Sequence, residues 1–269
     1  GQEAASAISM QFSSSSSSSR RASSIPIPPS LYTVTRFIQL SDNALNHLSF
    51  EERLGLLVDV EYTSRKNNKF HRLIKLAKFD QPHASVSDIN YSSGRMLNKA
   101  QIQKLSTCDY IHEAHNVIIM GATGAGKSYL SCALGMEACK RFYSVKYVRL
   151  PELVTDLAIA RGEGTYKKIF SQYKKVQLLV IDEWMLVNLT ENEARDVLEI
   201  VQARHKRTST IFCSQFSPAG WHKKIGETSL ADAILDRIVH DYYTIEIQNK
   251  DGKADQSMRE VYGLKNSKA

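Results

Sequence analysis

The stretch that decides the fold is Gly121-Ala122-Thr123-Gly124-Ala125-Gly126-Lys127-Ser128, which matches the pattern G-x-x-x-x-G-K-[ST] at every fixed position. Glycines let such a loop curl so that its backbone N–H groups point at phosphates. The helix that begins at the loop adds the positive end of its dipole. Lys127 is expected to reach the β- and γ-phosphates, and the Ser128 hydroxyl to bind Mg²⁺. The stretch therefore predicts a phosphate-binding loop for ATP and Mg²⁺.

The segments on either side of the loop support this interpretation. Residues 116–120 form an apolar run that predicts a buried strand leading into the loop, and residues 128–141 predict a helix behind it. A chance match in a glycine-rich turn would not be flanked by this strand and this helix.

A second apolar run, residues 176–181, ends in two acids, Asp182 and Glu183. At the tip of a strand, Asp182 is expected to hold the Mg²⁺ shell, while Glu183 is placed to polarise the attacking water as a general base. By itself, an acid pair after a strand is an ordinary exposed turn. Downstream of a complete phosphate-binding loop, with another strand between, the functional interpretation is favoured.

From about residue 116, short apolar runs alternate with helical segments, which is typical of βαβ units. Strands are expected at Val117–Met120, Ser144–Leu150, Leu178–Asp182, Thr210–Ser214 and Thr244–Ile247. Helices are expected at Lys127–Arg141, Pro151–Ala160, Tyr166–Lys174, Glu191–His205 and Leu230–His240. The sequence thus predicts an α/β P-loop NTPase fold, a parallel five-stranded sheet flanked by helices. Residues 248–269 are too few for a full C-terminal lid.

The strand at Ser144–Leu150 is expected to separate the strand before the loop from the strand that ends in Asp182. With Glu183, it indicates the branch of P-loop ATPases that has an additional strand and a catalytic glutamate, and it argues against a small-molecule kinase or a Ras-like GTPase. The guanine-reading motif N-K-x-D is also missing from the sequence.

Two further positions are candidates for catalysis. Ser214 or Gln215, at the tip of the fourth strand, either orients the attacking water or caps the strand end. Arg237 either acts as an arginine finger on a neighbouring subunit's γ-phosphate or pairs with Asp236 or another carboxylate.

The chain divides into three predicted parts: residues 1–40, a disordered serine-rich leader; residues 41–113, a small helical domain; and residues 114–269, the ATPase domain. The leader, with its serine run Ser13–Ser19, is either a solvated tail or gene-model artefact, or an organelle transit peptide. In the helical domain, Ser49 and Glu52 form a capping box, and a second helix is expected at Leu97–Leu105. One buried helical stripe is expected at Phe70, Leu73, Ile74 and Ala77.

The net charge of +7 suits a polyanionic partner. The first candidate surface for DNA is basic and uninterrupted by acids: Arg65, Lys66, Lys69, Arg72, Lys75 and Lys78. A second cluster comprises Lys167, Lys168, Lys174 and Lys175. Such residues predict contacts with phosphates and little sequence preference, although a solvated helix face has the same pattern.

The four cysteines, Cys108, Cys132, Cys139 and Cys213, form no C-x-x-C pair, so neither zinc nor a disulfide framework is indicated. Reduced, buried thiols are expected. The apolar runs are shorter than the ~18 residues of a membrane helix, which predicts a cytoplasmic protein without a membrane partner.

Several stretches resemble the IstB-type helper ATPases of transposition, which are AAA+ relatives of the DnaC-type helicase loaders. The resemblance extends over about residues 40 to 260 and rests on Phe50–Asp59, the phosphate-binding loop, Tyr147–Pro151, Ala231–Val239 and Ser257–Arg259. It implies a homo-oligomer that binds and deforms double-stranded DNA when loaded with ATP and presents it to a transposase. The transposase stimulates hydrolysis, which resets the helper. Arg237 would act in trans, and Arg259 would be a second phosphate-sensing arginine, although the link Gln248–Gln256 is longer than in the family.

Two alternatives remain. The first is a replicative helicase loader of the DnaC type, which would favour single-stranded DNA. The second is an adaptor that binds nucleotide without hydrolysing it, and Glu183 argues against this one.

Overall fold

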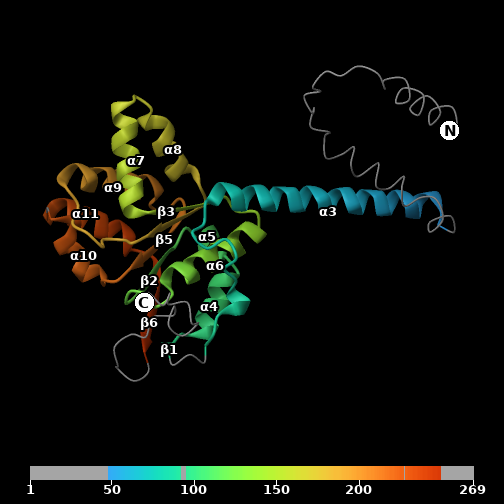
Figure 1. Ribbon diagram of the computed structural model, residues 1–269, viewed down its shortest axis with the longest axis horizontal. Helices are drawn as coiled ribbons and strands as arrows, with labels where there is room; N and C mark the ends of the chain where they lie inside the picture. The colour runs from blue at the N-terminus through green and yellow to red at the C-terminus, as the bar shows by residue number, and fades with distance from the viewer. Residues whose placement is uncertain (1–47, 92–94, 227, 250–269) are drawn as a thin grey trace, which may run out of the picture. The chain divides into compact units, whose positions relative to one another are not determined.

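The computed structural model describes residues 48–91, 95–226 and 228–249 (Figure 1). The serine-rich leader and Arg259 lie outside these residues. By their internal contacts, the residues divide into two compact units, Gly1–Arg65 and Lys66–Ala269. Each unit is described by itself.

The first unit contributes the beginning of helix α3 (Phe50–Ala77). Its capping box is confirmed, because Glu52 N donates to Ser49 Oγ at 3.2 Å and Ser49 N donates to Glu52 Oε2 at 2.7 Å. These bonds satisfy two backbone donors that a helix start leaves unpaired.

The second unit is built on a sheet with the strand order β1-β6-β2-β5-β4-β3. Its strands are β1 (Arg95–Met96), β2 (Asn116–Gly121), β3 (Val145–Arg149), β4 (Leu178–Asp182), β5 (Ser209–Ser214) and β6 (Tyr242–Asn249). Strands β2 to β6 run parallel, which confirms the predicted five-stranded sheet. The short strand β1, which was not predicted, adds an antiparallel edge beside β6.

The order of the strands corrects one expectation. The strand at Ser144–Leu150 separates the phosphate-binding loop from Asp182 in the chain but not in the sheet, where β3 is the outermost strand beyond β4. It is β5 that lies between β2 and β4, with Val117 paired to Ile211 and Leu178 to Ser209. The additional strand of this sheet is therefore β5.

The helices join the strands as expected. The elements before the loop are the end of α3, the short 3-10 helix η1 (Val86–Asp88), α4 (Lys99–Ser106) and α5 (Asp109–His112). The elements after it are α6 (Lys127–Lys140), α7 (Leu150–Gly162), α8 (Tyr166–Lys175), α9 (Glu191–Arg204), α10 (Pro218–Ile225) and α11 (Thr228–Ile238). The five predicted ATPase-domain helices begin and end within two residues of their expected positions, whereas α10 was not predicted.

Helices cover both faces of the sheet (Figure 1). Ile119 and Cys213 point into a core shared with α4 and α6, whereas Ile118 and Phe212 point into a core shared with α7 to α11. This alternation follows because successive side chains of a strand face opposite sides. The strands of a parallel sheet that is buried on both faces have continuous apolar sequences, and for this reason the strands could be predicted from the sequence.

Residues before the loop belong to the first of these cores. Leu73 and Ala77 of the predicted stripe are buried there, with Phe70 and Ile74 packed at its edge. The same core includes α6. The division of the chain at residues 113 and 114 stays a prediction.

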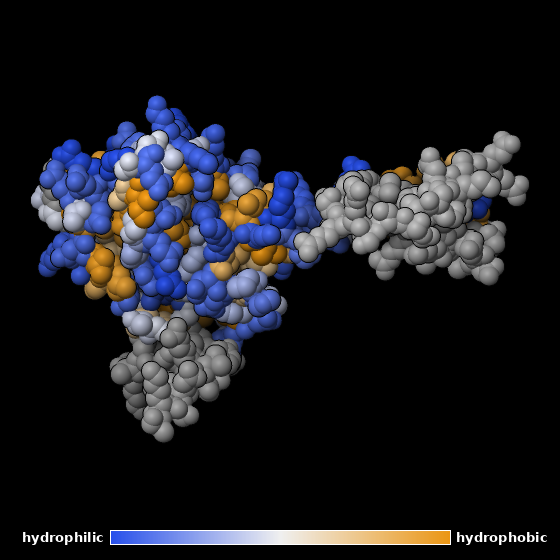
Figure 2. All heavy atoms as spheres, turned by 45° about the horizontal axis from the view of Figure 1, so that its top comes forward, coloured by the Kyte–Doolittle hydropathy of each residue, from blue (hydrophilic) through white to orange (hydrophobic). Residues whose placement is uncertain are grey.

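All four cysteines are buried and free, which confirms the predicted thiols. Burial raises the pKa of Cys132 to about 11 and that of Cys139 to about 12. Within the part of the chain that the structure describes, no helix is long and apolar enough to cross a membrane. On the face shown in Figure 2, polar side chains surround small apolar patches.

Candidate nucleotide-binding site

The phosphate-binding loop connects the end of β2 at Gly121 to the start of α6 at Lys127. Gly124 and Gly126 have φ angles of 79° and 97°, a left-handed conformation that other residues rarely adopt. Gly126 is the N-cap of α6 and offers no side chain to cap the helix. The first N–H groups of α6 can therefore donate to an anion, as the motif predicts.

Lys127 folds over this loop. Its Nζ donates to the carbonyl oxygens of Gly121 at 2.7 Å and Ala122 at 2.6 Å, which places the ammonium group against the loop. Both acceptors are neutral, so a triphosphate oxygen would be a stronger partner for the ammonium group. Ser128, the next residue, is half-buried in the first turn of α6. The loop therefore combines helix N–H groups, a lysine and a hydroxyl, which fits a magnesium-bound triphosphate.

Asp182 ends β4 and is only 3% exposed. Its Oδ2 accepts a hydrogen bond from the Tyr147 hydroxyl of β3 at 2.8 Å, and its Oδ1 accepts one from Glu183 N at 2.8 Å. Burial, followed by the charge of Asp182, raises the pKa of Tyr147 well above its ordinary value, so Tyr147 remains a donor. The carboxylate is thus fixed at the same edge of the sheet as the loop.

Strand β5 connects the two halves of the site. Its tip lies between β2 and β4, and Cys213 Sγ lies 3.9 Å from the Lys127 carbonyl oxygen. The structure therefore brings the loop, Asp182 and Glu183 to the carboxyl ends of two parallel strands that flank β5, and ligands bind at this end of open α/β sheets.

Glu183 has a left-handed backbone with a φ angle of 54°, which is uncommon for a residue with a side chain. The turn is attached to β5 through Trp184, whose N donates to Cys213 O at 2.8 Å and whose carbonyl oxygen accepts from Ser214 Oγ at 2.8 Å. Strained conformations persist where the surrounding structure holds them, and they are frequent at functional sites.

Ser214 is 1% exposed, and its hydroxyl group donates one hydrogen bond and accepts two. Besides donating to Trp184 O, it accepts hydrogen bonds from Phe216 N at 3.1 Å and Trp221 Nε1 at 2.9 Å. A serine hydroxyl has one donor and two acceptor positions. The geometry therefore favours capping of the strand end over orientation of water, and it leaves the exposed Gln215 as the candidate that could contact water.

Arg237 lies at the amino ends of the strands, whereas the loop lies at their carboxyl ends. It lines a small cavity with Asn116, the first residue of β2, whereas the phosphate-binding loop follows the last residue of β2. Its Nη1 donates to Ala233 O at 2.7 Å. Within the described part of the chain this guanidinium group therefore bonds to a carbonyl oxygen, and the two alternatives for Arg237 stay predictions. Arg237 and the loop of the same chain are not brought together.

The family profile of the IstB-like ATP binding protein matches residues 33–260 of the chain. The chain belongs to this family. The match includes every described residue of the site, from the phosphate-binding loop to Arg237.

Relatives of this IstB-like chain occur in bacterial insertion sequences. An insertion-sequence ATP-binding protein of Sinorhizobium fredii, y4pL, is 40% identical over 217 residues, which cover 81% of this chain and 88% of the relative. The ATP-binding protein of insertion sequence IS1162 from Pseudomonas fluorescens is 41% identical over 172 residues, covering 64% and 74%.

Solved structures share the fold. The crystal structure of DnaI has a TM-score of 0.54 at 23% identity and covers 66% of this chain and 94% of its own. AMPPCP-bound DnaA from Aquifex aeolicus has a TM-score of 0.53 at 20% identity and covers 70% and 57%. These similarities confirm the AAA+ type of P-loop fold.

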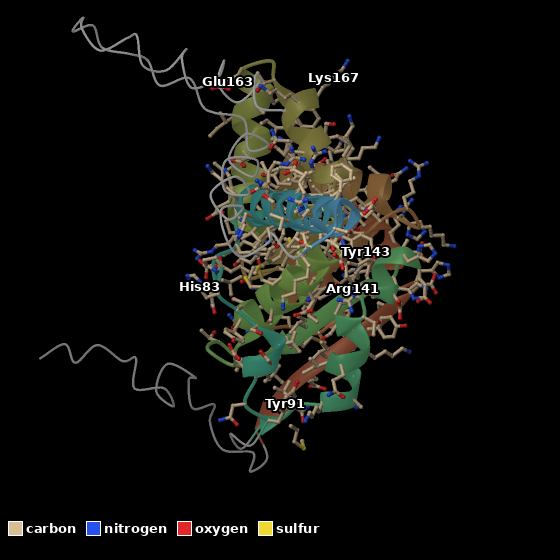
Figure 3. All side chains as sticks on the ribbon, turned by 90° about the vertical axis from the view of Figure 1, so that its right-hand side faces the viewer. His83, Tyr91, Arg141, Tyr143, Glu163 and Lys167 are labelled. Atoms are coloured by element: carbon tan, nitrogen blue, oxygen red, sulfur yellow. The ribbon has the colours of Figure 1, made fainter. Side chains whose placement is uncertain are left out.

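The predicted DNA surfaces of the IstB-like chain are exposed. On α3, Arg65 pairs with Glu61 at 2.6 Å, and Lys69 Nζ lies 4.8 Å from the ring centre of Phe142. On α8, Lys167 is exposed and extends away from the body of the chain (Figure 3). The other lysines of both clusters are exposed as well: Lys66, Lys75, Lys78, Lys168, Lys174 and Lys175, together with Arg72.

Sequence reasoning missed Tyr147 and Arg149, which contact the two acids, and it missed Asp80, which contacts Arg149. Tyr147 and Arg149 were quoted only as part of a stretch similar to the family. Their alternation in β3 could have indicated a shared face, but not that the face meets Asp182.

Proposed function

We propose that this IstB-like protein hydrolyses ATP with Mg²⁺ and uses the cycle to hold double-stranded DNA for a transposase. The observation that carries the proposal is the convergence of the loop, Asp182 and Glu183 at one edge of the sheet. Membership in a family of ATP-binding proteins, with relatives named for insertion sequences, supports the context.

Each residue has a defined part. The loop from Gly121 to Ser128 holds the phosphates through backbone N–H groups, and Lys127 turns from its carbonyl partners to the β- and γ-phosphates. Ser128 and Asp182 would hold Mg²⁺, which neutralises charge on the phosphates when bound. Glu183, half-exposed beside Asp182, accepts a proton from the attacking water.

Replacement of Glu183 by Gln tests the chemistry. The variant keeps the shape of the side chain but cannot accept a proton, so turnover should fall by about a hundredfold or more while ATP affinity stays unchanged. The matched control is Glu163→Gln, an exposed glutamate of the α7–α8 turn. Unchanged turnover in Glu183→Gln would show that Glu183 is not the general base.

Lys127→Ala tests binding, with Lys140→Ala at the other end of α6 as the control. Calorimetry with Mg²⁺ and ATP should detect binding to the control and to the wild type but not to Lys127→Ala. The absence of magnesium-dependent ATP binding by the folded wild type would refute the proposal as a whole.

The proposed DNA surfaces are Arg65, Lys66, Lys69, Arg72, Lys75 and Lys78 on and after α3, with the lysines of α8 as a second surface. Removing the side chain that neutralises one phosphate should reduce the log–log salt slope of duplex binding by about 0.9. We therefore expect Lys167→Ala to reduce the slope by about one, and Lys223→Ala, an exposed lysine of α10, to leave it unchanged.

The proposed assembly is a homo-oligomer in which Arg237 reaches the γ-phosphate of a neighbouring chain, and the transposase stimulates hydrolysis. A measured ATP-dependent preference for duplex over single-stranded DNA would support this function, whereas the reverse preference would indicate a helicase loader. Binding without turnover would indicate an adaptor. A cytoplasmic location stays a prediction.

A further inference from the structure

The last turn of α11, which carries Arg237, is held by two side chains from other elements. Helices α9 and α11 pack side by side (Figure 1). His205, the C-cap of α9, has its Nδ1 3.0 Å from the carbonyl oxygen of Arg237. Asn116, at the start of β2, donates from its Nδ2 to the carbonyl oxygen of Ile238 at 3.2 Å. The end of α11 is therefore attached both to α9 and to β2.

Both hydrogen bonds reach carbonyl groups that have no partner within α11. The last four carbonyl groups of a helix lack an intrahelical donor, and Arg237 and Ile238 are the last two residues of α11. A carbonyl oxygen can only accept, so His205 Nδ1 carries the hydrogen atom in this contact. His205 thus donates to the backbone of the residue whose side chain is the proposed arginine finger.

His205 is itself held in place from two sides. The residue before it, Arg204, is 2% exposed and donates to Tyr173 O and Ser209 O, which ties the end of α9 to α8 and β5. On its other side, the ring of His205 stacks on the ring of His240, with 5.9 Å between the ring centres. A ring fixed in this way can set the position of the last turn of α11.

The direction of the Arg237 side chain depends on this turn. Its Nη1 donates to Ala233 O at 2.7 Å, one turn back on α11, so the side chain follows its own helix. It also lines a small cavity together with His205 and Asn116. A group that acts in catalysis has to be placed accurately, because a displacement of about 1 Å can lower a rate by about a hundredfold. A small rotation of the helix end would therefore change what Arg237 can reach.

We propose that His205 is a positioning residue for Arg237. The hydrogen bond from His205 Nδ1 fixes the last turn of α11, so that the guanidinium group meets the γ-phosphate bound by a neighbouring chain. Asn116 holds the next carbonyl group in the same way. His205 of one chain therefore supports hydrolysis at the phosphate-binding loop of another. This inference rests on the proposed function, in which Arg237 acts in trans.

The first test compares His205→Leu with His205→Asn in the full chain, by steady-state ATP hydrolysis. Leucine removes the donor, so kcat should fall about fivefold, the effect of one lost hydrogen bond. Asparagine presents an N–H close to the place of Nδ1, so it should retain most of the wild-type kcat. ATP affinity should not change, because the loop lies at the other end of the sheet. His112→Leu, at an exposed histidine of α5, is the control.

The second test mixes chains and separates positioning in trans from stability in cis. Glu183→Gln chains keep Arg237 but should not hydrolyse ATP, so an excess of them supplies an intact arginine to the loops of His205→Leu chains. The rate per His205→Leu chain should then rise about fivefold, to the wild-type value. An excess of Glu183→Gln/Arg237→Ala chains should not raise it. His205→Ala takes the place of His205→Leu if the latter does not fold.

The same mixtures with Arg237→Ala separate this inference from the function on which it rests. Glu183→Gln chains should also restore the rate of Arg237→Ala chains. If they restore Arg237→Ala but not His205→Leu, or if His205→Leu alone keeps the wild-type kcat, His205 is not a positioning residue and the inference is overturned. If they fail to restore Arg237→Ala, the action of Arg237 in trans is overturned instead.

Discussion

The polar side chains at the two ends of the parallel sheet differ in their exposure and in their hydrogen-bond partners. At the carboxyl end, Lys127, Glu183 and Arg149 are half-exposed, and their partners are carbonyl oxygens or weak ion pairs. At the amino end, Arg204 is 2% exposed and is fully hydrogen-bonded inside the chain. The carboxyl end therefore has groups that can exchange partners with a ligand, whereas the amino end is held together by its polar groups.

Arg204 shows how the amino end is held. Its Nη1 donates to Tyr173 O at 2.7 Å, its Nη2 to Ser209 O at 2.6 Å, and its Nε to Thr210 Oγ1 at 3.0 Å. The acceptors come from the end of α8 and the start of β5. A buried charge is tolerated only when its hydrogen-bonding groups are satisfied, so this residue serves stability.

The largest expected effect concerns Arg237. This residue is half-buried at the amino end and cannot reach the loop of its own chain. If it acts in trans, Arg237→Ala should lower kcat by about 10³, in the range known for arginine fingers. Mixing Arg237→Ala chains with Lys127→Ala chains should restore turnover, since a mixed interface combines an intact arginine with an intact loop. Arg207→Ala, at an exposed arginine, is the control. An active Arg237→Ala variant would place Arg237 with the stabilising groups.

Arg204→Met is the second test, and it concerns stability. The change leaves the carbonyl groups of Tyr173 and Ser209 without these donors, so the free energy of unfolding should fall by about 3 kcal/mol. Urea denaturation measures it, with Arg207→Met as an exposed control on the same segment. ATP affinity of the folded fraction should not change. A loss of ATP affinity without a loss of stability would contradict the division between the two ends.

Ser214→Ala is the smallest test and concerns the turn that carries Glu183. It removes the hydrogen bond to Trp184 O, so the left-handed turn is held less firmly. We expect kcat to fall about fivefold with little change in KM, because a buried hydrogen bond contributes about 1 kcal/mol. Ser214→Thr, which keeps the hydroxyl, should recover activity, and Ser217→Ala, an exposed serine, should have no effect. Equal losses in KM and kcat would assign Ser214 a general structural role.

The parts of the fold that could be predicted depend on local patterns. The strands and the helices between them were located within two residues, because buried parallel strands and amphipathic helices have characteristic periods. Helix α10 was missed because eight residues with two buried side chains, Trp221 and Ile225, make a weak pattern. Strand β1 was missed because two residues form no pattern at all.

The site was predictable only in part. The loop and the acid pair could be identified because their residue types and their order in the chain reflect the chemistry of phosphate and metal binding. The contacts of Tyr147 with Asp182 and of Arg149 with Asp80 could not be identified. They join residues 35 and 69 positions apart, and their register is set by strand pairing and by the packing of Phe79 on α6.

By itself, the sequence determined that a glycine-rich loop stands between a buried strand and a helix, because glycine conformations and the positions of apolar residues are local properties of the chain. The tertiary structure alone decided that β5 lies between β2 and β4, that Ser214 holds the Glu183 turn, and that Arg237 lies at the opposite end of the sheet. The physical reason is that strand order and buried hydrogen bonds depend on which distant surfaces pack together, and this packing is shared among all the elements of the core.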